Sequence, residues 1–136
     1  FKVKVFSIGK SKEEWLKSAL SEYEKRLIGK ASVQWIFLKN NEELIDASKK
    51  EPYIALDPNG QLFDSVKWSQ VMVRYGLKLN FIIGGPEGLP LAIIDGAQLK
   101  WSLSPLTFTH QMTRLILIEQ IYRALEIDRG SSYHKA

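Results

Sequence analysis

The sequence predicts an α/β fold in which helices cover both faces of a mostly parallel sheet. Short apolar runs alternate with segments of helical periodicity along the whole chain. Turn residues separate these segments, and there is no linker, internal repeat or low-complexity stretch. Strands that alternate with helices favour a parallel sheet. The chain has 136 residues and is 45% hydrophobic, so we expect one domain, residues 1–136, with its own core.

The N-terminal part of the chain predicts two strands around one helix. Residues 2–8 alternate apolar and polar side chains, as a strand does. Ser11 and Glu14 fit a capping box at the start of a helix whose apolar residues recur at spacings of three and four. Gly29 fits the end of this helix, and residues 33–38 form the second predicted strand.

The middle of the chain predicts a further strand between two helices. Residues 40–50 have the pattern of a short polar helix, and residues 53–56 that of a short buried strand. The sequence Asp57–Gly60 is a strong turn signal because proline presets φ and glycine accepts a positive φ. Asp64 fits the N-cap of the next helix, which we expect to end at Gly76.

The C-terminal part predicts two strands and a long final helix. The strands are residues 79–83 and 99–103, with a short helix after Gly88 between them. The final helix, residues 109–127, is apolar nearly all round, so it belongs in a core or in a subunit interface. A domain of this size has little room to bury such a helix alone, and we therefore expect a homodimer.

Three charged residues interrupt this apolar helix. Glu119 and Arg123 are four residues apart and can pair across one turn. Arg114 is the third. Buried charges are normally paired, so an internal ion pair is as good an interpretation as a functional role.

Composition limits the classes of function. Cysteine is absent, which excludes disulfides and thiolate metal sites. No apolar run reaches the roughly 18 residues that span a membrane, and the N-terminus lacks the apolar segment of a signal peptide. We therefore expect a cytoplasmic protein with no membrane association. The formal net charge of +4 is compatible with an RNA partner.

Three predicted strand ends outline a candidate ligand pocket. In parallel sheets, ligands bind outside the carboxyl ends of the strands. This rule groups the turn after Leu56, the loop Gly84–Gly88 and the Ser/Thr-rich segment after Leu103. The glycine spacing fits neither a dinucleotide fold nor a P-loop, and Pro86 removes one amide donor. The loop suits a neutral or cationic ligand, although it can also be a simple tight turn. The Ser/Thr-rich segment can likewise be a strand end with a helix cap.

The two histidines, His110 and His134, are the candidate proton-transfer groups. They are too few and too far apart for a zinc site. No Ser-His-acid arrangement is evident. A histidine at the start of a helix, such as His110, can also be purely structural.

Four segments together resemble the RlmH family of SPOUT methyltransferases. They are Ile83–Leu89 (IGGPEGL), Leu103–His110 (LSPLTFTH), Arg114–Ala124 (RLILIEQIYRA) and Tyr133–Lys135 (YHK). Each is weak alone, but their order and spacing are specific, and the resemblance extends over essentially the whole chain. Pro90 stands where the family often has serine, and the region around residue 40 is short.

The resemblance implies a C-terminal trefoil knot, S-adenosylmethionine (SAM) as cofactor, a homodimer and methylation of N3 of a pseudouridine in 23S rRNA of the ribosome. It places the cofactor at Leu56, Gly85, Ser104, Pro105, Leu106, Thr107, Phe108 and Thr109. No metal is implied.

For catalysis we expect His134, on the polar tail, to assist loss of the imide proton, with His110 as the second candidate. Tyr133 and Arg123 complete the expected catalytic group. Arg123 and Lys135 can hold phosphates.

Three alternatives stay open at this point. A SPOUT enzyme can methylate a different RNA nucleotide. A non-catalytic ribosome-binding module can keep the fold without SAM affinity, although the intact loops argue against this. A nucleotide-dependent α/β enzyme is the third, and the missing phosphate-loop spacings argue against it.

Overall fold

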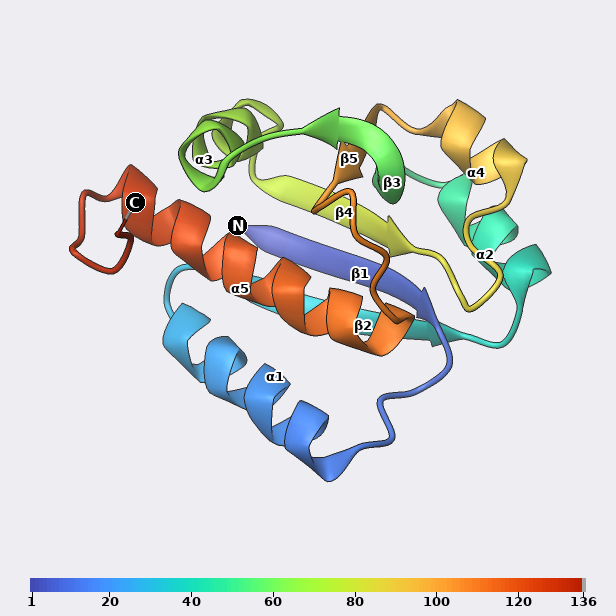
Figure 1. Ribbon diagram of the computed structural model, residues 1–136, viewed down its shortest axis with the longest axis horizontal. Coiled ribbons are helices and arrows are strands. Elements are labelled where there is room, and N and C mark those ends of the chain that lie inside the picture. Colours follow the sequence, from blue (N-terminus) through green and yellow to red (C-terminus); the bar gives the residue numbers. More distant parts are fainter. Residues whose placement is uncertain (136) are drawn as a thin grey trace.

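In the computed structural model, residues 1–135 are described, and five strands alternate with five helices in the predicted order (Figure 1). Ala136, the last residue of the predicted domain, lies outside the described residues. The strands are β1 (Lys2–Ile8), β2 (Ser32–Leu38), β3 (Ile54–Leu62), β4 (Lys78–Ile83) and β5 (Leu99–Ser102). The helices are α1 (Glu14–Leu27), α2 (Asn41–Ser48), α3 (Ser65–Arg74), α4 (Leu91–Gly96) and α5 (His110–Asp128).

The sheet has the strand order β2-β1-β4-β3-β5, and every neighbouring pair is parallel. Helices α1, α5 and α3 lie side by side on one face, whereas α2 and α4 cover the other (Figure 1). The predicted α/β fold with helices on both faces is therefore confirmed. The trefoil knot stays a prediction.

Each face of the sheet buries its own core. The larger core lies beneath α1, α3 and α5, where the indole rings of Trp68 and Trp101 stack with centroids 3.7 Å apart. The smaller core, beneath α2 and α4, centres on Leu44, Tyr53 and Ile93. The strand alternation read from the sequence follows from this arrangement, since successive side chains enter different cores.

Several helix boundaries follow the predicted signals. The carboxylate of Asp64 accepts a hydrogen bond of 2.8 Å from the Lys67 amide, as an N-cap does. Gly29 and Gly76 follow α1 and α3 with φ of +84° and +92°, a conformation that glycine adopts without strain.

The predicted capping box at Ser11 is wrong. Helix α1 begins at Glu14, and its N-cap, Glu13, makes no side-chain capping hydrogen bond. The Ser11 hydroxyl instead accepts a hydrogen bond of 3.0 Å from Arg114 in α5. The Ser11 hydroxyl, which the local pattern assigned to the start of α1, therefore binds the distant, buried guanidinium of Arg114.

The predicted end of the third strand at Leu56 is also wrong. Strand β3 continues to Leu62, and residues 57–60 form an irregularity, since Leu56 and Gln61 both pair with Trp101 of β5. A Cβ on Gly60 would lie 2.6 Å from the Lys100 carbonyl carbon, so glycine permits the close approach of the two backbones. The turn residues are real, but they form a bulge within the strand.

Candidate functional site

The three predicted segments lie on neighbouring strands: the bulge after Leu56 is within β3, and the other two segments follow β4 and β5 on either side of it. Leu56 pairs with Ile83 of β4 on one side and with Trp101 of β5 on the other. Gly85 comes two residues after Ile83, and Ser104 comes three residues after Trp101. The strand register therefore places Leu56, Gly85 and Ser104 at one edge of the sheet. Binding of a cofactor there remains a prediction.

The glycine-rich segment, residues 84–88, is a tight turn closed on itself. The Gly88 amide donates to the Gly85 carbonyl at 2.9 Å, and Gly88 has φ of +82°. A Cβ on Gly84 would lie 2.8 Å from the Gly88 carbonyl carbon. Gly84 and Gly88 are thus needed by the turn itself. At Gly85 a Cβ would meet only the Ile8 side chain, at 3.2 Å, so the turn does not require glycine there.

The segment from Ser104 to Thr109 is ordered by its own hydroxyl groups. The Ser104 hydroxyl accepts from the Leu106 amide at 3.0 Å, and the Ser102 hydroxyl donates to the Ser104 carbonyl at 2.9 Å. The Thr109 hydroxyl caps α5 by accepting from the Met112 amide at 3.2 Å. The Leu106 side chain is 69% exposed at this edge. The segment carries no charged side chain, so it offers a neutral, partly apolar surface.

His110 is the first residue of α5 and lies at the same edge of the sheet. Its Nε2 is 3.2 Å from the side-chain nitrogen Nε2 of Gln111, and the side-chain oxygen Oε1 of Gln111 accepts from Arg114 at 3.1 Å. Because this second bond orients the amide, its nitrogen donates and His110 Nε2 accepts. Burial, and secondly the charge of Arg114, lower the pKa of His110. The ring is therefore neutral at neutral pH, with its proton on Nδ1.

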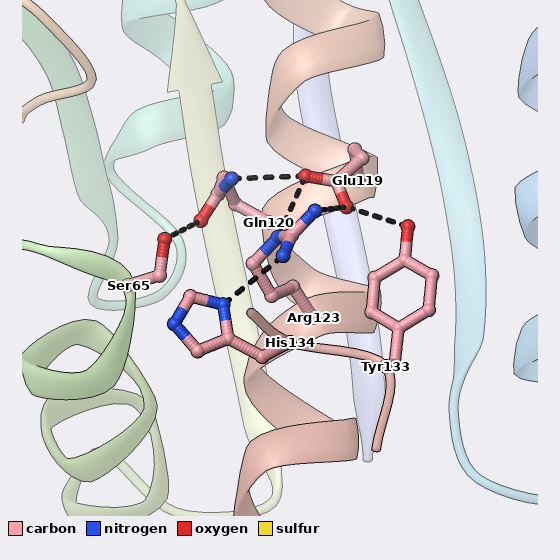
Figure 2. A network of polar contacts seen from close by, with 6 residues as sticks. All are labelled: Ser65, Glu119, Gln120, Arg123, Tyr133 and His134. Carbon is pink, nitrogen blue, oxygen red and sulfur yellow. Dashed lines mark hydrogen bonds and ion pairs between the residues drawn. The ribbon is translucent and has the colours of Figure 1, made fainter. Parts of the chain in front are cut away.

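The other predicted catalytic residues form a network between α5 and the C-terminal tail (Figure 2). Arg123 contacts both oxygens of Glu119 at 3.2 Å, which confirms the predicted pair. The Tyr133 hydroxyl donates to Glu119 at 3.0 Å, and Arg123 Nη1 lies 3.0 Å from His134 Nδ1. The hydrogen bond from Arg123 to Glu119 raises the pKa of Arg123. Burial, first, and hydrogen bonding raise the pKa of Tyr133.

The contact with Arg123 fixes the tautomer of His134. A guanidinium group only donates hydrogen bonds, so His134 Nδ1 must be the acceptor. A neutral imidazole then carries its proton on Nε2. In this arrangement His134 presents an N–H donor, and not a free lone pair, on the side of the ring away from Arg123.

The fold of the single chain keeps the predicted cofactor segments and the C-terminal tail apart. From His110 to Arg123, α5 rises about 20 Å at about 1.5 Å per residue. The start of α5 contacts Gly9 at the carboxyl end of β1, whereas near its end Glu126 pairs with Lys30, just before β2 begins. The predicted cofactor residues and His134 therefore lie at opposite ends of α5.

Two supporting contacts were missed by sequence reasoning. Ser65 donates to Gln120 at 2.8 Å, and Gln120 donates to Glu119 at 2.9 Å, so α3 also holds the tail network (Figure 2). Arg114 is fully buried and binds Ser7 in β1. The sequence signal for the Arg114 contact was a serine at an inward-facing position of β1, where the neighbouring inward residues are valines. No sequence pattern linked Ser65 to Gln120.

Among residues 1–135, no three His, Asp or Glu residues are grouped to hold a metal ion. None of the described helices is long and apolar enough to cross a membrane. Two hollows, of about 460 and about 300 Å³, lie beside α3 and beneath α2, and the predicted cofactor residues line neither.

Comparisons with known proteins agree with this architecture. A family described as "Predicted SPOUT methyltransferase" matches residues 1–134. Ribosomal RNA large subunit methyltransferase H of Protochlamydia amoebophila is 46% identical, over 98% of this chain and 99% of that protein. The protein of the same name from Prochlorococcus marinus (strain MIT 9515) is 36% identical over 99% and 96%.

Solved structures of low sequence identity share the fold. The SpoU methyltransferase AviRb from Streptomyces viridochromogenes, in complex with the cofactor AdoMet, superposes with a TM-score of 0.52 and 11% identity. The match covers 94% of this chain and 58% of that one.

Proposed function

Because this chain belongs to the ribosomal RNA large subunit methyltransferase H family of SPOUT methyltransferases, we propose that it methylates ribosomal RNA with SAM as the methyl donor. The finer proposal is that the target is N3 of a pseudouridine in 23S rRNA. The observation that carries the proposal is the register that aligns Leu56, Gly85 and Ser104 at one edge of the sheet.

The residues at this edge fit SAM. Its sulfonium is cationic, and the segment from Ser104 to Thr109 presents only neutral groups. Leu106, which is 69% exposed, and the half-buried Phe108 supply apolar surface for a purine ring. Glycine at position 85 is not needed by the turn itself, which fits a role in ligand binding. When bound, SAM supplies an activated methyl group. The trefoil knot that the family resemblance implies would hold these loops together and is part of this proposal.

The tail would act on the target base. N3 of a pseudouridine is an imide nitrogen, and its proton passes to solvent before the attack. The resulting negative charge is shared with the flanking carbonyl oxygens until the N–CH₃ bond forms and the C–S bond breaks, which leaves a neutral base. His134, with its proton on Nε2 and its Nδ1 held by Arg123, can donate a hydrogen bond to one of these oxygens. Tyr133 fixes Glu119, which aligns Arg123.

The active site would span two subunits of a homodimer. The loops and the tail of one chain lie at opposite ends of α5, so the tail of one chain would meet the loops of its partner. The outward side of α5 is apolar: Met112 is 36% exposed, and Leu115 and Ile116 are only half-buried. A second copy of the chain would cover this stripe.

The substrate would be an assembled ribosomal particle in the cytoplasm. The described residues form a single sheet with helices on both faces, and the net charge of +4 is modest for recognition of RNA alone. Recognition of one nucleotide would then depend on the shape of the folded particle. We expect the large subunit or the 70S ribosome to be a better substrate than naked 23S rRNA.

Calorimetric titration with SAM tests the cofactor proposal. We expect saturable binding to the free protein, or to the protein on ribosomes, with a defined stoichiometry per dimer. NAD and ATP should not compete. Absence of SAM binding in both settings would favour a ribosome-binding module without catalysis.

A further inference from the structure

Arg114, near the start of α5, makes more side-chain hydrogen bonds than any other residue described in that part of the helix. It donates to the Ser7 hydroxyl from Nε at 3.1 Å and from Nη2 at 2.9 Å. Nη2 also donates to the carbonyls of Ile8 and Gly9, at 2.9 and 2.6 Å. Nη1 donates to Ser11 and Gln111, at 3.0 and 3.1 Å.

Arg114 is buried among neutral partners. The side chain is fully buried, and no ion pair among residues 1–135 includes it. Its guanidinium carbon lies 4.7 Å from the centre of the Phe37 ring. Burial lowers the pKa of Arg114 to about 10, which still leaves it charged at neutral pH. Burying a charge is costly, so its neutral partners must be held in fixed places to compensate.

The hydrogen-bond partners of Arg114 connect it to the Gly85 loop and to His110. Arg114 holds the backbone of Ile8, and the Ile8 side chain lies directly against Gly85, where Cδ1 would be 3.2 Å from an added Cβ. Arg114 also orients Gln111, whose amide donates to His110. The Gln111 amide further donates to the Lys10 carbonyl at 3.2 Å, which ties the chain after β1 to α5.

We propose that Arg114 is a positioning residue that aligns the Gly85 loop with His110 by clamping the end of β1 to the start of α5. It touches neither the proposed cofactor nor the RNA, and it acts through Ile8 and Gln111. The proposal rests on the proposed function insofar as the Gly85 loop is a SAM loop. The clamp itself is a property of residues 7–11 and 110–114.

Arg114→Lys tests the clamp because it keeps the charge but replaces a planar fork of five donors with one ammonium group. Arg74→Lys, on the exposed part of α3, is the matched control. We expect Arg114→Lys to fold, and its Kd for SAM to rise about tenfold, the effect of one lost charge-assisted hydrogen bond. Arg74→Lys should bind as the unchanged protein does. A folded Arg114→Lys protein with unchanged SAM affinity would overturn the proposal.

Gln111→Glu gives a second measurement that depends neither on SAM nor on whether Arg114→Lys folds. The carboxylate still accepts from Arg114, but it cannot donate to His110 Nε2. Nitrogen-15 NMR of the imidazole should show the His110 proton on Nδ1 in the unchanged protein and on Nε2 in the variant. An unchanged His110 spectrum would contradict the clamp.

The same two experiments separate this proposal from the proposed function. If the unchanged protein binds no SAM, the methyltransferase proposal fails. The His110 spectra still decide whether Arg114 and Gln111 fix the tautomer of the His110 ring. If the unchanged protein binds SAM but both variants behave like it, only the clamp fails.

Discussion

Arg123 Nη1 lies 3.0 Å from His134 Nδ1, and this contact fixes the tautomer of the His134 ring. The arginine can only donate, so the free nitrogen, Nε2, carries the proton of the neutral ring. The network from Ser65 through Gln120 and Glu119 holds the arginine in place (Figure 2). In the proposed reaction, His134 would therefore donate a hydrogen bond to the base from Nε2, because its Nδ1 is occupied by Arg123.

His134→Ala should cut methyl transfer to ribosomes by about 10²–10³-fold, the usual effect of removing a donor to developing negative charge. The Kd for SAM should stay the same, because the tail lies far from the loops of its own chain and contacts the base in the proposed site. Ser132→Ala, an exposed neighbour in the tail, is the control. Equal rates for the two variants would remove His134 from the reaction.

The glycine loop gives a matched pair of substitutions. Gly84→Ala should lower the melting temperature, because its Cβ would lie 2.8 Å from the Gly88 carbonyl carbon. Gly85→Ala should leave the melting temperature nearly unchanged, because the flexible Ile8 side chain can move. It should instead weaken SAM binding, because the displaced Ile8 side chain would shift the loop against which the cofactor is proposed to lie. Thermal melts and SAM titrations of both variants measure this, and equal SAM affinity in Gly85→Ala and the unchanged protein would refute the cofactor role of Gly85.

The local signals of the sequence predicted the order of elements but not the distant polar contacts. The N-cap at Asp64 and the helix end at Gly76 depend only on neighbouring residues, so the local sequence pattern was sufficient to predict both boundaries of α3. Ser11 fitted a local capping box and failed, because Arg114 from α5 uses its hydroxyl. The alignment of the three segments was predictable because the strands are parallel, although Leu56 lies at a bulge within β3 and not at its end.

The tail was less predictable. Glu119 and Arg123 pair within one helix, so their spacing predicted the contact. The contacts of Tyr133 and His134 depend on how the chain turns back after α5, which no local pattern encodes. The long separation between tail and loops also follows only from the three-dimensional path of α5.

Glu126 should make stability depend on acid pH. Its side chain is 2% exposed, and hydrogen bonding from Lys30, first, and from Arg129 lowers its pKa from 4.5 to about 2. A carboxyl group with a lowered folded-state pKa stabilises the fold above its unfolded pKa and loses this contribution as the pH falls through the folded pKa. This contribution should therefore disappear as the pH falls from 4.5 to about 2.

Urea unfolding of Glu126→Gln at several pH values measures this contribution. At neutral pH the variant should be less stable than the unchanged protein, and the difference should shrink below pH 4.5. Glu42→Gln, at an exposed position in α2, should show neither effect. A difference that is independent of pH would show that the Glu126 charge is not the cause.

Mixing two inactive variants tests whether the site spans two subunits. His134→Ala lacks a working tail, and Gly85→Val should lack a working loop. In a mixed dimer, one site would combine the intact loops of the first chain with the intact tail of the second. We expect partial recovery of methyl transfer after the two proteins are unfolded and refolded together. No recovery, with mixed dimers demonstrated by mass spectrometry, would place each site within one subunit.

The central claim is that this chain transfers a methyl group from SAM to ribosomal RNA. The most direct measurement is incubation of the purified protein with labelled SAM and ribosomes that lack this modification, followed by mass spectrometry of the RNA. We predict one methyl group at N3 of one pseudouridine in 23S rRNA, with lower yield on naked RNA. Ribosomes that remain unmethylated by a protein that binds them would contradict the account, and a methyl group on another nucleotide would replace the proposed target.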